Sequence, residues 1–90
     1  MLLFHAQREA GGHSEDALIA LTYGLLGAHV LGLGACALGL VPPVVERSPV
    51  LRELFHIPPN NEVVACMILG YPKYRFRRGI RRELAGVTWV

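Results

Sequence analysis

The most constraining feature of this sequence is a long segment without formal charge. No Asp, Glu, Lys or Arg occurs from residue 17 to residue 45. Such a segment either spans a membrane or lies inside a folded protein. Acidic residues precede it, His29 lies within it, and glycines and prolines interrupt its second half, which argues against a membrane helix. The segment therefore predicts a buried helix followed by a glycine-rich loop, and no association with a membrane.

The chain is short for the amount of apolar sequence that it contains. Its 90 residues are 52% hydrophobic and 18% charged, which excludes a disordered chain. A core of this size is marginal without a cofactor, an oligomer or more polypeptide. The apolar run Met1–Phe4 predicts a short buried strand that begins without any lead-in, so we expect an upstream part of the fold. The excess of apolar surface also predicts self-association, with a dimer as the expected form.

The two cysteines indicate a reducing compartment. Cys36 and Cys66 both lie within apolar runs, a setting typical of buried free thiols rather than of a secreted disulfide framework. The first residues reach charge too soon for a signal sequence. We expect a cytoplasmic protein.

Local signals predict a long helix over Glu15–Leu31. Ser14 is positioned to cap its first turn, acidic residues follow at the positive end of the helix dipole, and Gly32 ends it. Small residues recur every four positions, which places them in one stripe that another backbone can approach closely; they are Ala20, Gly24, Ala28 and Gly32. Because the rest of the helix is also apolar, we expect it to be buried all round.

Further signals predict the remaining elements. Ser48 followed by Pro49 predicts the start of a short amphipathic helix. The segment Glu62–Leu69 is apolar without alternation, which predicts a central strand covered on both faces. The last residues, Val87–Val90, are a candidate edge or docking strand. One covered strand and two helices cannot cover one another completely, so the chain resembles part of a larger fold.

The distribution of charge separates the chain into two parts. Residues 1–72 hold three arginines against six carboxylates, a net charge of −3, whereas residues 73–90 hold six cations against Glu83 alone, a net charge of +5. Aromatic residues are interspersed among these cations. This basic tail can neutralise a phosphate or stack with nucleic-acid bases, and it can also be an ordinary solvated surface.

Several kinds of chemistry have no support in the sequence. The histidines and cysteines lack metal-ligand spacing, and no arrangement of serine, histidine and aspartate indicates a hydrolase. The segment Gly32–Leu40 contains G-x-G, but it follows a helix and lacks the third glycine of a dinucleotide-binding loop. Its small residues suit close approach of the backbone to a flat ligand, and they suit a structural turn equally well.

The order of these motifs resembles the C-terminal part of the FMN-dependent nitroreductase family. The resemblance rests on GLGACALGL, on the stretch I-P-x-N-x-E-V-V-A with the following L-G-Y-P, and on Arg82 ahead of V-T-W. Members fused to ferredoxin-type domains are the most similar. The resemblance implies an α+β fold, with a sheet sandwiched by helices, completed by a partner chain or an N-terminal half. It also implies one partial domain over residues 1–90, with a helix and strand core at 1–72 and a basic tail at 73–90.

The same resemblance implies the function and the site. Members are usually homodimers that bind FMN, take hydride from NAD(P)H and reduce nitroaromatic, quinone or similar acceptors. The flavin carries the chemistry, so no catalytic side chain and no metal is expected. The resemblance places the flavin ring beside a run of backbone and the phosphate beside tail cations; these residues are Ala35, Cys36, Ala37, Leu38 and Gly39 for the ring, and Arg82 with Arg81 for the phosphate.

This sequence departs from the family at three points. The early helices that build much of the dimer and of the flavin pocket are absent, and Leu38-Gly39 stands where many members have an acidic residue with glycine or an aromatic pair. The N-terminal motif rich in arginine and serine that binds the phosphate is absent. Two other interpretations therefore stay open: a small nucleic-acid-binding module that uses the tail, and a non-catalytic remnant that oligomerises. Arg75 is expected to lie on the surface away from the cofactor.

Overall fold

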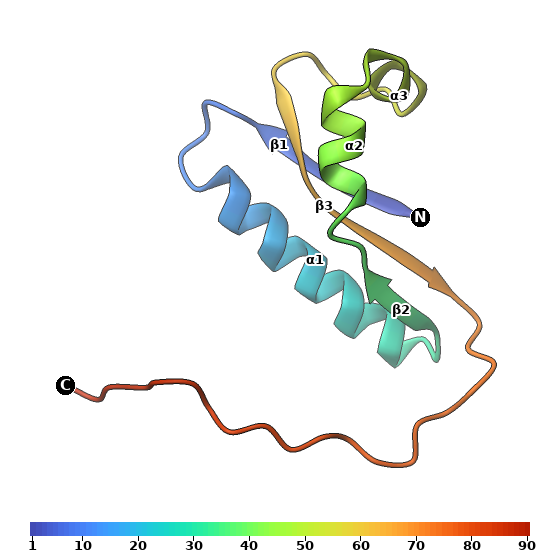
Figure 1. Cartoon of the computed structure of the whole chain (residues 1–90), viewed down its shortest axis with the longest axis vertical. Coiled ribbons are helices and arrows are strands. Elements are labelled where there is room, and N and C mark those ends of the chain that lie inside the picture. Colours follow the sequence, from blue (N-terminus) through green and yellow to red (C-terminus); the bar gives the residue numbers. More distant parts are fainter.

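The computed structural model describes all 90 residues as a three-stranded sheet with three helices and a long tail (Figure 1). In chain order the elements are β1 (Leu2–Gln7), α1 (His13–Val30), β2 (Gly34–Ala37), α2 (Val41–Arg47), α3 (Pro49–Leu54) and β3 (Asn61–Gly70). This is the α+β architecture that the sequence predicts.

The longest strand, β3, is the centre of the sheet. The strand order is β1-β3-β2, and both neighbours are antiparallel to β3. β1 pairs with the first part of β3, from Gln7 opposite Asn61 to Leu2 opposite Met67, with one irregularity between Phe4 and His5. β2 pairs with the last part of β3. The prediction of a central strand over Glu62–Leu69 is confirmed.

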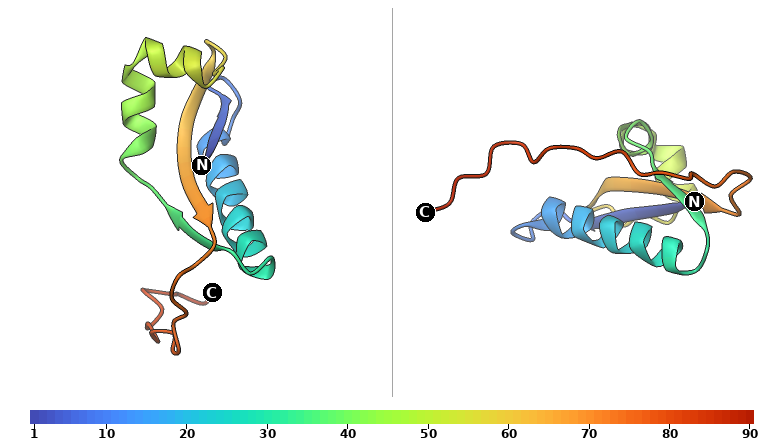
Figure 2. Two further views of the ribbon diagram at one scale, coloured as in Figure 1. Left: turned by 90° about the vertical axis from the view of Figure 1, so that its right-hand side faces the viewer. Right: turned by 90° about the horizontal axis from the view of Figure 1, so that it is seen from below.

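Helices cover both faces of this strand. Figure 2 shows α1 on one face of the sheet and α2 on the other. Four residues of β3 are buried, namely Val63, Ala65, Cys66 and Met67. On the α2 side, a small core joins Val45, Ile57 and Val63. The apolar run of β3 is therefore covered on both faces only over Val63–Met67. The predicted coverage does not extend to the end of the run, because Ile68 and Leu69 are 44% and 40% exposed.

The stripe of small residues on α1 allows this helix to lie close to the sheet. A Cβ atom at Gly24 would lie 3.0 Å from the Met67 Sδ and 3.4 Å from the Phe4 Cζ. Ala17 and Ala28, on the same side, are buried. The packing role of the stripe is thus seen at Gly24 and Ala28, whereas Ala20 and Gly32, its first and last members, are exposed.

The opposite side of α1 is not covered in this chain, which corrects the prediction of a helix buried all round. Leu18, Ile19, Tyr23 and Leu26 have exposed fractions of 49%, 56%, 73% and 59%. The sheet contacts only one side of α1, and no other element of this chain lies against the opposite side. β1 is likewise only half-buried, because its outer edge has no neighbouring strand.

The ends of α1 differ in detail from the sequence prediction. Gly12, in a left-handed conformation, precedes the first residue, His13. Ser14 therefore lies inside the helix and caps no backbone N–H group. At the other end, Gly32 has a φ of +73° and directly follows the C-cap Leu31. A left-handed residue at this position commonly ends a helix, and glycine adopts it without steric cost.

Two elements were missed in the segment that follows α1. The stretch predicted as a loop contains the edge strand β2, and Cys36, predicted to be buried, is exposed there. Pro42 and Pro43, which suggested an irregular link, lie in the first turn of α2, where the missing N–H groups of proline cost nothing. By contrast, the predicted start of α3 is confirmed, because the Ser48 Oγ accepts a hydrogen bond from the Leu51 N–H at 3.3 Å.

The chain beyond Gly70 has no regular secondary structure and runs away from the sheet (Figure 1). The candidate strand at Val87–Val90 does not form here. The Cα radius of gyration is 15.8 Å, whereas a compact domain of this length has about 12 Å. An isolated strand needs a partner for its hydrogen bonds, and the tail meets none within this chain.

None of the three helices combines the length and the hydrophobicity that a membrane-spanning helix requires.

Candidate functional site

The segment predicted to lie beside a flat ligand is an open edge of the sheet. Residues 34–37 form β2, and the Leu38 N–H continues the ladder by donating to the Cys66 carbonyl at 2.9 Å. Bonded and non-bonded pairs alternate along an antiparallel ladder, so the backbone N–H and C=O groups of Ala35 and Ala37 point away from β3. No strand follows on that side. The backbone of this segment is therefore available to hydrogen-bond another group.

The far end of the segment is also uncrowded. A Cβ atom placed on Gly39 would have no atom within 4 Å. Ala35, Cys36 and Ala37 are exposed, and Leu38 is half-buried. The side chains present here are small, so a planar molecule can approach the backbone closely.

α2 follows this segment directly, and one carboxylate holds α2 in place. Glu46 accepts hydrogen bonds from the guanidinium groups of Arg8 and Arg52 and, at 2.8 Å, from the Val63 N–H of β3. Its side chain is only 19% exposed. Burial alone would raise the pKa of this carboxyl, but the Val63 hydrogen bond and the two guanidinium charges outweigh it and lower the pKa. Arg52 also donates to the carbonyls of Pro58 and Asn61, so α2, α3 and β3 are tied together.

A second ionic contact lies at the same end of the molecule. His13 lies with Nε2 3.0 Å from the Glu62 Oε2 and Nδ1 3.1 Å from the Ala10 carbonyl oxygen. Both ring nitrogens thus face acceptors, an arrangement that suits the doubly protonated imidazolium. The hydrogen bond to Glu62 is the main cause that raises the pKa of His13. These charged groups stabilise the fold and lie at the end of β3 remote from β2.

The end of the sheet that carries β2 has two surface hollows where the other end has charged contacts. A cavity of about 570 Å3 lies between the C-terminal end of α1 and the start of the tail. It is lined by His29, Gly32, Leu33, Gly34, Ala35, Pro72, Tyr74, Arg75 and Phe76. A second hollow of about 330 Å3 shares Gly34, Ala35 and Pro72 with it and extends along Cys36 toward Ile68. Both hollows reach the backbone segment that the sequence singles out.

The predicted phosphate-binding residues lie elsewhere. Arg81 and Arg82 are exposed residues of the extended tail, and neither lines a cavity that includes β2. The structure therefore does not bring them together with Ala35–Gly39 within one chain. It does bring Arg75 to Gly34 and Ala35, which sequence reasoning missed. Its short distance in sequence from Gly70, where β3 ends, was the available signal.

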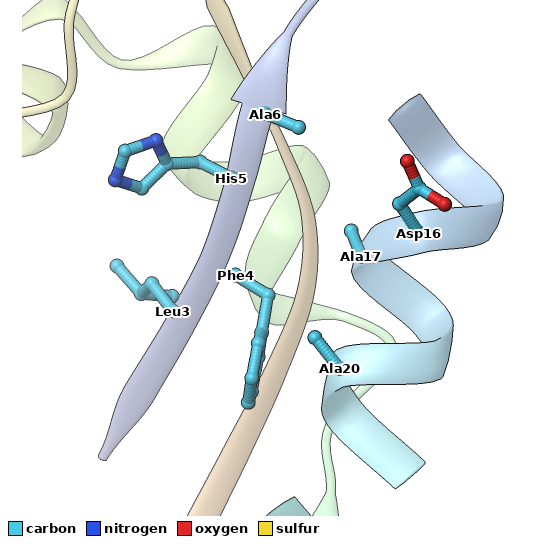
Figure 3. Close-up of a pocket in the computed structure, with 7 residues that line it drawn as sticks. All are labelled: Leu3, Phe4, His5, Ala6, Asp16, Ala17 and Ala20. Atoms are coloured by element: carbon cyan, nitrogen blue, oxygen red, sulfur yellow. The ribbon is translucent and has the colours of Figure 1, made fainter. Parts of the chain in front are cut away.

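Another groove follows the free edge of β1 (Figure 3). Phe4 and Ala6 point toward α1, from which Ala17 and Ala20 face them, whereas His5 points the other way. None of the predicted site residues lies in this groove. Its apolar lining marks β1 as a second incomplete edge of the sheet.

The cysteines differ in environment. Cys66 is buried at the centre of the sheet, and burial raises the pKa of its thiol. Cys36, on the open edge, is free and exposed. A buried thiol with a raised pKa is a poor nucleophile, so Cys66 acts as a core residue.

Comparison with known proteins decides the family. A model of the nitroreductase family matches residues 2–71, which include every helix and strand described above. The chain belongs to the nitroreductase family. A relative from Archaeoglobus fulgidus, provisionally named NADH dehydrogenase/NAD(P)H nitroreductase, is 44% identical over 59 residues, which are 66% of this chain and 33% of that protein. The nitroreductase segment described here thus spans about a third of the length of this relative.

A solved structure confirms the fold of this nitroreductase segment. The crystal structure of a nitroreductase with bound FMN from Bacteroides fragilis matches it with a TM-score of 0.77 at 20% sequence identity. The match covers 96% of this chain and 48% of the other. The arrangement of sheet and helices is therefore that of about half of a nitroreductase.

Proposed function

We propose that this chain is the cofactor-binding part of an FMN-dependent NAD(P)H oxidoreductase of the nitroreductase type, which reduces nitroaromatic, quinone or similar acceptors. Membership of the family over residues 2–71 is the observation that carries this proposal. The open edge at β2 supports it, because it presents unpaired backbone groups and small side chains at the position where the family resemblance expects the flavin ring.

The ring end of an FMN molecule fits the residues present. Ala35 and Ala37 offer backbone N–H and C=O groups to the polar edge of a flavin, while Gly39 leaves space above the segment. When bound, the flavin supplies hydride acceptance and onward electron transfer. The chain itself orients the ring, and Glu46 keeps the segment in position by anchoring the helix that follows it.

The phosphate end requires a different arrangement of the tail. In our proposal Arg82, assisted by Arg81, binds the phosphate, since guanidinium groups bind phosphate in a bidentate manner. Both lie on an arm with no regular structure, so the tail must fold back or reach a site on another copy. The apolar face of α1 favours a dimer or a complementary N-terminal half as the missing cover, because exposed apolar surface of this kind marks an interface.

Calorimetric titration with FMN tests the assignment, using the chain alone and mixed with a complementary N-terminal half. A charge-assisted hydrogen bond contributes about 1.5 to 3 kcal/mol, so Arg82→Ala should weaken binding by about tenfold to a hundredfold. Arg78→Ala, which removes another exposed tail cation, is the matched control and should bind as the wild type does. Equal FMN affinity of the wild type and Arg82→Ala would contradict the proposed phosphate ligand.

A second candidate function is nucleic-acid binding by the tail. It is favoured by the exposure of aromatic side chains beside the cations, with Tyr71 and Phe76 94% and 97% exposed. Such binding is strongly salt-dependent. An oligonucleotide affinity that falls steeply with salt, together with no affinity for FMN, would favour this function over the first.

A further inference from the structure

The cavity at the C-terminal end of α1 combines features that the flavin site alone does not explain. Its volume of about 570 Å3 is that of a small-molecule site. Its floor is the side-chain-poor backbone of Gly32–Ala35, and its walls carry Tyr74, Arg75 and Phe76. Tyr74 and Phe76 are 73% and 97% exposed, so two aromatic rings and a guanidinium group border an open hollow, which adjoins the segment proposed to hold the flavin ring.

The charges around this cavity are all of one sign. Arg75 and His29 are its ionisable basic groups, and no carboxylate lines it. Lys73 adds a further cation nearby, with its Nζ 5.5 Å from the centre of the Tyr74 ring. An anion that enters the cavity would therefore meet attraction and no fixed negative side chain.

The acidic residues of the folded part lie toward the other end of the molecule. Glu15 and Asp16 are in the first turn of α1, about 21 to 23 Å from its C-terminal end at the rise of an α-helix. Glu46 and Glu62 lie at the start of β3 and pair there with Arg8. Their fields are screened over such a distance.

The end of α1 does not repel an anion as strongly as a bare helix end would. Its last carbonyls would ordinarily present negative partial charge. Here the N–H groups of Leu31, Gly32 and Leu33 donate to the carbonyls of Gly27, His29 and Ala28. These hydrogen bonds leave Arg75 as the dominant charge at the cavity.

We propose that this cavity binds an aromatic acceptor that carries a carboxylate or a similar anionic group, with Arg75 as the residue that recognises the anion. This assignment rests on the proposed function, because the acceptor would lie beside the segment Ala35–Gly39 and hence beside the flavin. The aromatic ring packs against the Tyr74 and Phe76 side chains, and the anionic group faces Arg75. Arg75 sets specificity and takes no part in electron transfer.

The test is a pair of titrations of the intact chain without flavin, in which binding is monitored by the NMR chemical shifts of the backbone amides. The probes are 4-nitrobenzoate and the neutral 4-nitrobenzyl alcohol, which have similar rings. We expect the anion to bind about tenfold more tightly, as a charge-assisted contact implies, with shifts at Gly34 and Ala35. Arg75→Gln should abolish this preference, and Arg78→Gln should retain it.

Equal affinity for both probes, an equal loss in Arg75→Gln and Arg78→Gln, or shifts confined to residues outside the cavity would overturn the assignment. Because Arg75 is exposed and outside every helix and strand, the circular dichroism of Arg75→Gln should match that of the wild type. FMN titrations of the same samples separate the two proposals. A retained preference for the anion, with no FMN binding even after a complementary N-terminal half is added, would contradict the proposed function and leave the cavity assignment standing.

Discussion

The two ends of the central strand β3 are built in opposite ways. At its start, charged side chains close the structure: Glu46 joins α2 to Arg8, Arg52 and the Val63 N–H, and Glu62 contacts His13. At its other end, β2 leaves an open backbone edge beside two hollows. At the first end the charged groups are paired within the chain, whereas at the second the backbone groups of β2 are unpaired, and our proposal places a ligand or another chain there.

The largest expected effect comes from a charge placed between these ends. Met67 is 1% exposed, whereas its neighbour Ile68 is 44% exposed. Met67→Asp should prevent folding, because an unpaired buried carboxylate costs several kcal/mol, comparable with the whole stability of a small domain. Ile68→Asp should reduce stability far less. Urea unfolding of both variants measures this, and equal losses would show that the two faces of β3 are not covered as described.

Removing the carboxylate at the closed end should have the next largest effect. Glu46→Gln removes the negative charge that faces both Arg8 and Arg52 and should lower the free energy of unfolding by about 2 kcal/mol. Glu53→Gln, in α3, is the control. The lowered pKa of Glu46 stabilises the fold above its ordinary value of 4.5, and this stabilisation is lost as the pH falls through the lowered pKa. The free energy of unfolding of Glu46→Gln should therefore fall less than that of the wild type as the pH is lowered below 4.5, which acid unfolding of both proteins measures.

A smaller effect distinguishes the two sides of α1. Gly27→Ala adds a methyl group in open space and should stabilise the helix by about 0.8 kcal/mol. Gly24→Ala has the same intrinsic gain, but its Cβ would lie 3.0 Å from the Met67 Sδ, so the gain should be cancelled or reversed. Thermal unfolding compares the two variants. A Gly24→Ala variant as stable as Gly27→Ala would show that α1 is not in close contact with the sheet.

The smallest expected effect concerns His13. Its raised pKa means that the contact with Glu62 contributes stability below the ordinary value of 6.5 and loses it as the pH rises through the raised pKa. Because the group is near the surface, the change should be slight. His13→Gln should flatten the dependence of stability on pH above 6.5, and His56→Gln should leave it unchanged. If stability depends on pH in the same way in His13→Gln and in the wild type, the contact between His13 and Glu62 does not stabilise this end of the molecule.

The sequence predicts the elements whose signals are local. The apolar run of β3, the small stripe on α1, Gly32 at the helix end and the Ser48 cap follow from propensities that act within a few residues. β2 was missed because a strand of four small residues is defined by its pairing with β3, which lies far away in the sequence. The ionic network at Glu46 was missed for the same reason, since Arg8 is 38 residues away from it.

The errors in burial have a different origin. Leu18 and Tyr23 of α1 were expected in a core because they are apolar, but burial depends on what else is present. In this chain the sheet covers only one side of the helix. Likewise, Arg81 and Arg82 were assigned by resemblance to one site with Ala35–Gly39, and their tail reaches no such position within one chain. In our proposal, a second chain or an N-terminal half brings them there.

The mass and flavin content of the native assembly test the central claim most directly. Native mass spectrometry of the chain, with and without added FMN, measures both quantities in one experiment. We predict an assembly larger than the 9.9 kDa chain, with FMN bound in a fixed ratio and with the affinity reduced by Arg82→Ala. A stable monomer that binds no FMN at any concentration, alone or with a complementary N-terminal half, would contradict the claim that the open end of this sheet is a flavin site.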